Sequence, residues 1–191
     1  ISMETMIIEK RDNSAITTIV RHLASNDLVI MPCDTIYGIV GGAPQTEIAL
    51  RTVKGRPEEK PFIQLMTIEM ARSMVAEPID PAIERFWPGA LTVILKTKEN
   101  KDTAVRVPSD PWLIRILEQL GQPIFSSSVN TSGEPALVTL DAILERFNGT
   151  VPLIVKGSSD QGTIASTILD ATVRPYRLIR QGLVDVSSLL G

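Results

Sequence analysis

Three cations, Lys54, Arg56 and Lys60, stand close together in a chain whose net charge is −3. The glycine after Lys54 and the proline after Arg56 disfavour a continued helix, because a residue before proline is pushed toward an extended conformation. In an extended segment, residues two apart share a face, so Lys54 and Arg56 can point at one anion. Arginine and lysine together suit a polyphosphate. A solvated surface run, partly neutralised by Glu58 and Glu59, is the alternative, and the cluster alone leaves both open.

A second polar stretch follows an apolar run near residue 124. With the period of two that a strand imposes, Ser126, Ser128 and Asn130 face the same way. Short hydroxyls and an amide at the end of a strand suit a phosphate, a ribose or a carboxylate. A polar turn without a ligand is the alternative, and the stretch by itself does not exclude it.

A third candidate is Arg106, which alternates with Val105 and Val107 in an otherwise apolar strand pattern. An arginine on one face of such a strand needs solvent or an anionic partner. That partner is either a carboxylate of the protein, in a structural ion pair, or a ligand. Ser166 and Arg180, in the last two predicted strands, leave the same two alternatives open.

The composition restricts the chemistry. The 191 residues include one cysteine, Cys33, and one histidine, His22. Together they can form neither an internal disulfide nor a structural zinc site. A catalytic triad would have to use His22, which lies in a helical pattern and is predicted to be a histidine of the helix surface. Reactions must therefore rest on Lys, Arg, Ser, Thr, Asn and Asp side chains.

Several common binding classes are also excluded. Neither the P-loop pattern nor the Gly-x-Gly-x-x-Gly fingerprint occurs in the chain. The negative net charge argues against a protein that coats nucleic acid by bulk charge. No run of about 18 apolar residues is present to span a membrane, and no export signal precedes the first predicted element. These features predict a cytoplasmic protein that is an α/β enzyme or a binder of a polyanion.

Hydrophobic periodicity predicts the elements that must position these residues. Apolar stripes at helical spacing predict helices over 16–23, 46–53, 113–120 and 140–147, the first capped by Asp12 or Asn13, the third ended by Gly121 and the fourth capped by Thr139. Strands are predicted at 28–31, 62–66, 91–96, 104–107, 124–128, 153–155, 166–170 and 176–180. Their interleaving indicates an α/β fold with a twisted, mostly mixed sheet, and residues 1–191 read as a single domain.

Taken together, the motifs resemble the YrdC-like family of threonylcarbamoyl-AMP synthases. The motifs are Pro32-Cys33-Asp34-Thr35-Ile36-Tyr37-Gly38, Lys54-Gly55-Arg56, Lys60-Pro61, Trp87-Pro88-Gly89, Arg106-Val107-Pro108, Ser128-Val129-Asn130 with Ser132-Gly133, Ser166-Thr167-Ile168 and Arg180-Gln181-Gly182. Each motif alone is a weak indication of the family, but their order along the chain is specific to it. The resemblance extends over residues 12–182.

The resemblance implies an open α/β fold with a positively lined concave cavity and a nucleotidyltransferase activity. L-threonine, bicarbonate and ATP would give threonylcarbamoyl-AMP and pyrophosphate, and a separate transferase complex would use the product to modify adenosine 37 of tRNA. Mg²⁺ is expected to arrive with ATP, without a metal site of the protein. The ATP-binding positions implied are Lys54, Arg56, Lys60, Ser128, Asn130 and Arg180, with Lys54 and Arg56 as the catalytic pair. The threonine-binding positions implied are Thr35, Arg106, Ser126 and Ser166.

Three positions depart from the family pattern. Cys33 stands where threonine is usual, Ala136 where many members have a serine, and Leu65 where some have a histidine. The chain also ends soon after Arg180, which predicts a short form without the additional C-terminal domain of longer members. The alternative function is a YrdC- or YciO-like protein that binds tRNA or double-stranded RNA weakly and catalyses nothing. Salt-dependent tRNA binding without threonine-dependent pyrophosphate release would favour it.

Overall fold

The computed structural model describes residues 3–34, 36–57, 61–157 and 164–191. Its helices are α1 (Ala15–Ala24), α2 (Glu47–Lys54), α3 (Ile68–Met74), α4 (Pro81–Glu84), α5 (Pro111–Leu120), α6 (Leu140–Phe147) and the short η1 (Ser187–Leu189). Its strands are β1 (Met6–Glu9), β2 (Val29–Pro32), β3 (Tyr37–Gly42), β4 (Ile63–Leu65), β5 (Leu91–Lys96), β6 (Asp102–Arg106), β7 (Ile124–Ser128), β8 (Leu153–Lys156), β9 (Thr167–Asp170) and β10 (Arg177–Arg180).

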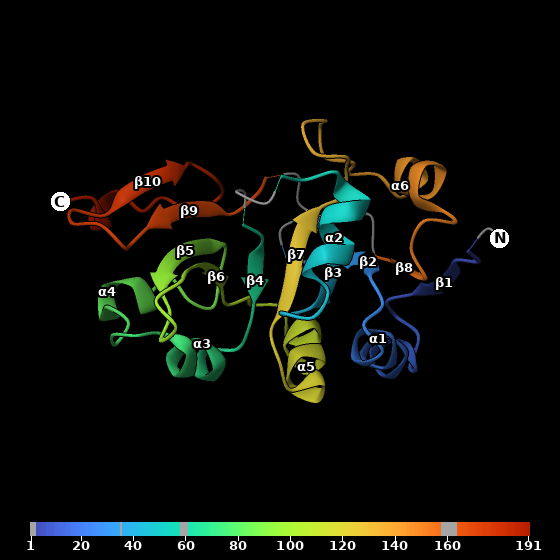
Figure 1. Ribbon diagram of the computed structural model, residues 1–191, viewed down its shortest axis with the longest axis horizontal. Coiled ribbons are helices and arrows are strands. Elements are labelled where there is room, and N and C mark those ends of the chain that lie inside the picture. Colours follow the sequence, from blue (N-terminus) through green and yellow to red (C-terminus); the bar gives the residue numbers. More distant parts are fainter. Residues whose placement is uncertain (1–2, 35, 58–60, 158–163) are drawn as a thin grey trace.

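In the described part of the chain, ten strands form one sheet in the order β1-β8-β2-β3-β7-β4-β6-β5-β9-β10 (Figure 1). The pairs β1/β8, β8/β2, β4/β6 and β5/β9 are parallel, and the other neighbours are antiparallel. The sheet is therefore mixed, as predicted, and the α/β class is confirmed. None of the described helices has the length and apolar character that crossing a membrane requires.

Helices cover both faces of the first half of the sheet, with α1 and α5 on one side and α2 and α6 on the other (Figure 1). Along β2, Val29 and Met31 pack with the residues of α1 and α5, whereas Ile30 packs with those of α2 and α6. A strand buried on both faces requires apolar residues at every position, because successive side chains point to opposite sides. That requirement explains the unbroken apolar run that predicted this strand.

In the second half of the sheet, one face packs in a hydrophobic core and the other faces a cavity. Val93 of β5 and Val105 of β6 pack with Ile83 of α4 in one hydrophobic core. The neighbouring positions Ala104 and Arg106 point to the opposite face, where they line a cavity. Alternation along β6 thus places an arginine on the cavity side of a strand whose other side is core, as the valines around it predicted.

Local sequence signals set most helix ends. Gly121 ends α5 with φ of 75°, a left-handed conformation that glycine adopts at low cost. The Thr139 side chain accepts a hydrogen bond from the Ala142 backbone N–H at 3.3 Å and so caps α6, as predicted. The predicted cap of the first helix is wrong. Ser14 occupies that position, and Asp12 instead accepts a hydrogen bond from the Glu9 N–H in the turn that follows β1.

The sequence patterns predict neither β1 and β3 nor α3 and α4, all of which are present in the structure. The clearest case is β3, whose sequence Tyr-Gly-Ile-Val-Gly-Gly combines three strand-forming residues with three glycines, which weaken the strand signal, yet every residue of it is buried and β3 pairs with β2 and β7. Close packing explains the glycine at position 41. A Cβ atom there would lie 2.3 Å from Thr46 Oγ1 and 2.8 Å from the Leu28 side chain. Tertiary contact, which local propensity does not include, thus favours this strand.

The substitution Leu117→Ala tests the packing of α5 on the sheet. Leu117 is fully buried, so its truncation leaves a cavity and should lower the free energy of unfolding by about 2–5 kcal/mol. Urea denaturation measures the change. The matched control is Leu183→Ala, at a side chain that is 57% exposed, which should change stability by less than about 0.5 kcal/mol. Equal effects of the two substitutions would contradict this assignment of the core.

Candidate active site

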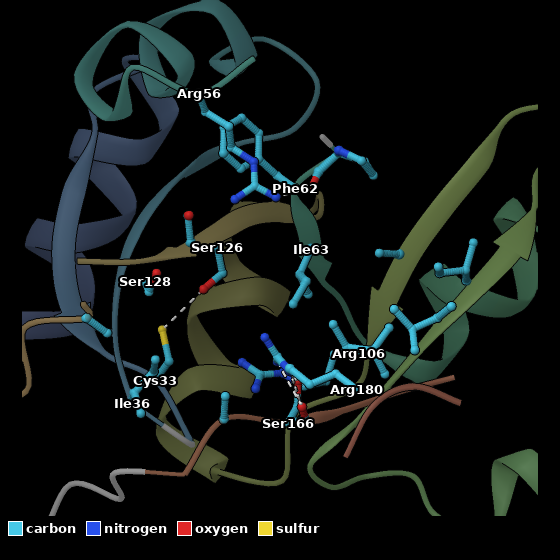
Figure 2. Close-up of a pocket in the computed structure, with 18 of the residues that line it drawn as sticks. Cys33, Ile36, Arg56, Phe62, Ile63, Arg106, Ser126, Ser128, Ser166 and Arg180 are labelled. Atoms are coloured by element: carbon cyan, nitrogen blue, oxygen red, sulfur yellow. Dashed lines mark hydrogen bonds between the residues drawn. The ribbon is translucent and has the colours of Figure 1, made fainter. Parts of the chain in front are cut away.

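A cavity of about 490 Å³ lies on the open face of the sheet, between β4 and β7 on one side and β5, β6, β9 and β10 on the other. Six of the residues predicted from sequence line it, and these are Arg56, Arg106, Arg180, Ser126, Ser128 and Ser166. Figure 2 shows that Arg56 lies at one end of the cavity and that Arg106, Arg180 and Ser166 gather at the other. The lining thus combines two cationic ends with a wall of hydroxyl groups.

At the second end, Arg180 is held by the backbone of Ser166. Its Nε and Nη2 atoms donate to the Ser166 carbonyl oxygen at 3.1 and 2.8 Å. The Ser166 hydroxyl is in turn 2.8 Å from Thr92 Oγ1. Burial and the neighbouring charge of Arg106 both lower the pKa of Arg180, in that order of importance. Two guanidinium groups are thus close enough to interact, which favours an anion between them.

Arg106 is 4% exposed and forms an ion pair with Asp34, with 3.0 Å between Nη2 and Oδ1. The structural ion pair considered for this residue is therefore present. The guanidinium also lines the cavity, so the two alternatives raised by the sequence do not exclude each other. Ligand binding by Arg106 remains a prediction.

At the first end, Arg56 packs on an aromatic ring. Its guanidinium carbon is 5.0 Å from the centre of the Phe62 ring, and Nη2 donates to the Pro61 carbonyl oxygen at 2.8 Å. Arg51 lies over the same ring at 4.8 Å. Burial and the charge of Arg51 lower the pKa of Arg56. Sequence reasoning missed Phe62, because an apolar strand residue gives no signal of its contact with two cations.

Lys54 occupies a position that the sequence analysis did not anticipate. It is the last residue of α2 and is 1% exposed, and Gly55 follows it in the left-handed conformation with φ of 62°. The predicted extended segment, in which Lys54 and Arg56 share a face, is therefore wrong. The helix continues through Lys54, since its end is set at Gly55 rather than by the later proline.

The Lys54 side chain reaches the end of β7. Its Nζ atom donates to the Ser128 carbonyl oxygen at 2.5 Å and contacts Asn130 Oδ1. Asn130 Oδ1 also accepts from the Ser128 hydroxyl at 3.0 Å, and Asn130 Nδ2 donates to the Glu134 carbonyl. Lys54 and Asn130 thus lie behind the cavity wall and hold Ser128 in it. Burial, with a smaller contribution from the charge of Arg56, lowers the pKa of Lys54 to about 8.

The hydroxyl groups of the wall come from Ser126, Ser127 and Ser128 at the end of β7, which we call the serine wall. The strand itself lies where it was predicted. Ser126 and Ser128 line the cavity, but Ser127 also reaches it. Gly38 of β3 pairs with Ser128 of β7, and because it has no side chain it leaves room for the side chains of the wall. A Cβ atom at Gly38 would lie 2.8 Å from Ser126 Oγ and 2.9 Å from Cys33 Sγ.

The three departures from the family pattern lie in different places. Cys33 and Ala136 line the cavity, whereas Leu65 is fully buried in the core between β4 and α5. Burial raises the pKa of the Cys33 thiol to about 11, so the thiol stays protonated at neutral pH. Its Sγ atom lies 3.8 Å from Ser126 Oγ. Cys33 therefore acts as a neutral wall residue rather than as a nucleophile.

Other predicted positions lie elsewhere. Thr35 and Lys60 fall outside the described residues. His22 is on α1, where Nδ1 lies 2.9 Å from Asp27 Oδ2, and it does not line the cavity. Among the residues that the structure describes, no three His, Cys, Asp or Glu side chains gather closely enough to hold a metal ion.

Comparison with known proteins decides the family. A model of the Sua5, YciO and YrdC proteins, described as telomere recombination, matches residues 21–182. The chain belongs to this family. The resemblance inferred from the motifs is thereby confirmed.

One curated relative and two solved structures illustrate what this chain is similar to. The threonylcarbamoyl-AMP synthase of Pyrococcus abyssi is 30% identical over 183 residues, which are 86% of this chain and 54% of that protein. The crystal structure of P. abyssi Sua5 complexed with L-threonine superposes with a TM-score of 0.88 at 27% identity, over 97% of this chain and 59% of that one. E. coli YciO shares the fold, with a TM-score of 0.83 at 22% identity over 98% of both chains. The chain spans about half the length of the first curated relatives that it matches.

The lowered pKa of Lys54 has a measurable consequence for stability. The unfolded chain binds more protons than the folded one between pH 8 and 10.5, because Lys54 titrates at about 8 when folded and 10.5 is its ordinary value. The free energy of unfolding should therefore rise across this window relative to that of Lys54→Met. Urea denaturation of both proteins at several pH values measures the difference. Titration of the Lys54 ¹³Cε resonance with a midpoint near 10.5 would contradict the burial argument.

Proposed function

We propose that this chain forms threonylcarbamoyl-AMP and pyrophosphate from L-threonine, bicarbonate and ATP. The observation that carries the proposal is the cavity with two cationic ends, Arg56 at one and the Arg106–Arg180 pair at the other, joined by the serine wall of β7. One end suits a polyphosphate and the other a carboxylate beside a phosphate. The name of the P. abyssi relative and the threonine bound by P. abyssi Sua5 support the same assignment.

In this proposal the nucleotide occupies the end near Arg56. Arg56 and Lys60 bind the phosphates that leave as pyrophosphate, and the Ser128 hydroxyl contacts the nucleotide. The resemblance implies that Lys54 and Asn130 bind ATP and that Lys54 is catalytic. Both contact Ser128 and neither is in the cavity lining, so we propose instead that they act by holding the end of β7. Mg²⁺ arrives on the phosphates of ATP, because oxygen ligands of a nucleotide satisfy most of its preferred geometry.

The amino acid occupies the other end. Arg106 binds the threonine carboxylate, a group whose two oxygens match the fork of a guanidinium. Thr35, Ser126 and Ser166 contact the rest of threonine. Arg180 lies beside Arg106 and not beside Arg56, so we place it at the α-phosphate, where nucleotide and amino acid meet.

The reaction needs alignment more than proton transfer. The threonine amine condenses with bicarbonate to give a carbamate and water. A carbamate oxygen then attacks the α-phosphorus of ATP, the bond from this phosphorus to the bridging oxygen of the β-phosphate breaks, and pyrophosphate leaves with that electron pair. Negative charge grows on the leaving group, and the cations that line the cavity stabilise it without moving.

The product is a reactive mixed anhydride that must be consumed by a second enzyme. We propose that a transferase complex takes it to modify adenosine 37 of tRNA, as the family resemblance implies. Direct contact with tRNA is not needed for the chemistry in the cavity. A net charge of −3 is also unfavourable for binding of RNA by bulk charge.

Omission of each substrate in turn tests the proposed function. Pyrophosphate release should require L-threonine, bicarbonate and ATP together, because the carbamate is the nucleophile. A coupled phosphate assay measures the rate, and mass spectrometry identifies threonylcarbamoyl-AMP. Equal release without threonine would refute the proposal. Steeply salt-dependent tRNA binding without any release would instead favour the RNA-binding alternative.

The substitution Arg56→Ala tests the phosphate end. Loss of one charge-assisted contact in the transition state should lower kcat/KM by about 10- to 150-fold. Steady-state pyrophosphate release measures this change. Arg115→Ala, at an exposed position of α5, is the matched control and should leave the rate unchanged. A near-normal rate for Arg56→Ala, with normal thermal stability, would show that Arg56 is a solvated surface cation that does not bind the phosphates.

A further inference from the structure

The ion pair between Asp34 and Arg106 joins two parts of the sheet that are not neighbours. Asp34 follows the end of β2, and Arg106 is the last residue of β6. Three strands, β3, β7 and β4, lie between β2 and β6 in the sheet. Adjacent strands are 4.7–4.9 Å apart, so a flat sheet would separate β2 and β6 by about 19 Å. The 3.0 Å contact is therefore made by the residues that follow β2 and by the long Arg106 side chain, which together span the width of the three strands between them.

A backbone hydrogen bond joins the residues on either side of Asp34. The Cys33 N–H donates to the Ile36 carbonyl oxygen at 3.1 Å, which closes the turn around position 34. The second carboxylate oxygen of Asp34 faces the chain after β6, where the Ser109 N–H lies 3.4 Å from Oδ2. One carboxylate thus contacts both the guanidinium of Arg106 and the backbone that follows it.

Both partners are excluded from solvent, since their side chains are 4% and 6% exposed. A guanidinium in such an environment is stable only with a carboxylate or another anion near it. The ion pair therefore limits the directions that Arg106 can adopt. It also leaves the guanidinium in the cavity lining, beside Arg180.

We propose that Asp34 is a positioning residue for the amino-acid substrate. It holds the Arg106 guanidinium in the orientation that receives the substrate carboxylate, and it ties the turn after β2 to the far side of the cavity. This inference rests on the proposed function, because it takes Arg106 as the carboxylate-binding group. Asp34 itself does not need to touch the substrate.

The substitution Asp34→Asn keeps the shape of the side chain and removes its charge. The threonine KM should rise about tenfold or more, whereas the KM for ATP should stay within about twofold. Asp34→Glu, which restores the carboxylate, should recover part of the threonine affinity. The readouts are pyrophosphate release, threonine binding by isothermal calorimetry and thermal melting.

The matched control is Asp170→Asn, since Asp170 is another largely buried aspartate of the sheet, paired with Arg177 at 3.5 Å and outside the cavity lining. It should lower the melting temperature without changing the threonine KM. If Asp34→Asn behaves in the same way, Asp34 is only structural and the inference is wrong.

A double-mutant cycle with Arg106→Gln tests whether Asp34 acts through Arg106. In the Arg106→Gln background, Asp34→Asn should cause no further loss of threonine affinity. The double variant also removes both buried charges together, so it should fold even where Asp34→Asn alone does not. Independent, additive losses would overturn the inference.

Failure of the proposed function gives a different result. If the wild-type chain neither binds threonine nor releases pyrophosphate, both proposals fall, whatever Asp34 does. If the wild type binds threonine normally and Asp34→Asn binds it equally well, only the positioning role of Asp34 is refuted.

Discussion

The cationic groups in the cavity lining and directly behind it must stay charged while they are withdrawn from water, and hydrogen bonds from neighbouring elements meet that requirement. Lys54 and Arg180 donate to main-chain carbonyl oxygens, those of Ser128 and Ser166. A carbonyl satisfies a donor without cancelling its charge, so the side chain is held and still attracts an anion. Burial lowers the pKa of both groups, which is the cost of holding Arg180 in the cavity lining and Lys54 against the serine wall, withdrawn from water.

The sheet provides the geometry that makes this arrangement possible. In the first half, β2, β3 and β8 pack against helices on both faces and so support the serine wall of β7. The second half gives one face to the core and the other to the cavity. Glycine permits the closest approaches. At Gly182 a Cβ atom would lie 2.4 Å from the Ala165 carbonyl oxygen, directly behind the segment that holds Arg180.

Membership of the family agrees with this physical description and adds chemistry to it. A cavity with cations at both ends and few titratable side chains suits a reaction that depends on alignment and on stabilisation of charge. Cys33 and Ala136 change two wall positions without adding or removing a charge at neutral pH. The cationic ends, on which the proposed chemistry depends, keep the residue types of the family motifs at Arg56, Arg106 and Arg180.

Much of the fold could be predicted from sequence because its signals are local. The helix ended by Gly121 and the helix capped by Thr139 follow from apolar periodicity and from hydrogen bonds within one turn. Buried strands such as β5 and β7 are recognisable because apolar and small residues persist over most of their length. The alternation around Arg106 correctly assigned its face, since the period of two is a property of any strand.

The site depended on contacts between distant segments, which only the tertiary structure decided. The strand β3 is stabilised by its two neighbours rather than by its glycine-rich sequence. Lys54 is buried because α2 ends against β7, and nothing in its local sequence indicates a partner at Ser128. Asp34 meets Arg106 across three intervening strands, a contact between segments that are far apart in the sequence. The sequence thus determined which residues carry charge and, within the regular alternation of a strand, on which face Arg106 lies. The tertiary structure decided which of the charged residues meet, because pairing across a cavity depends on long-range packing.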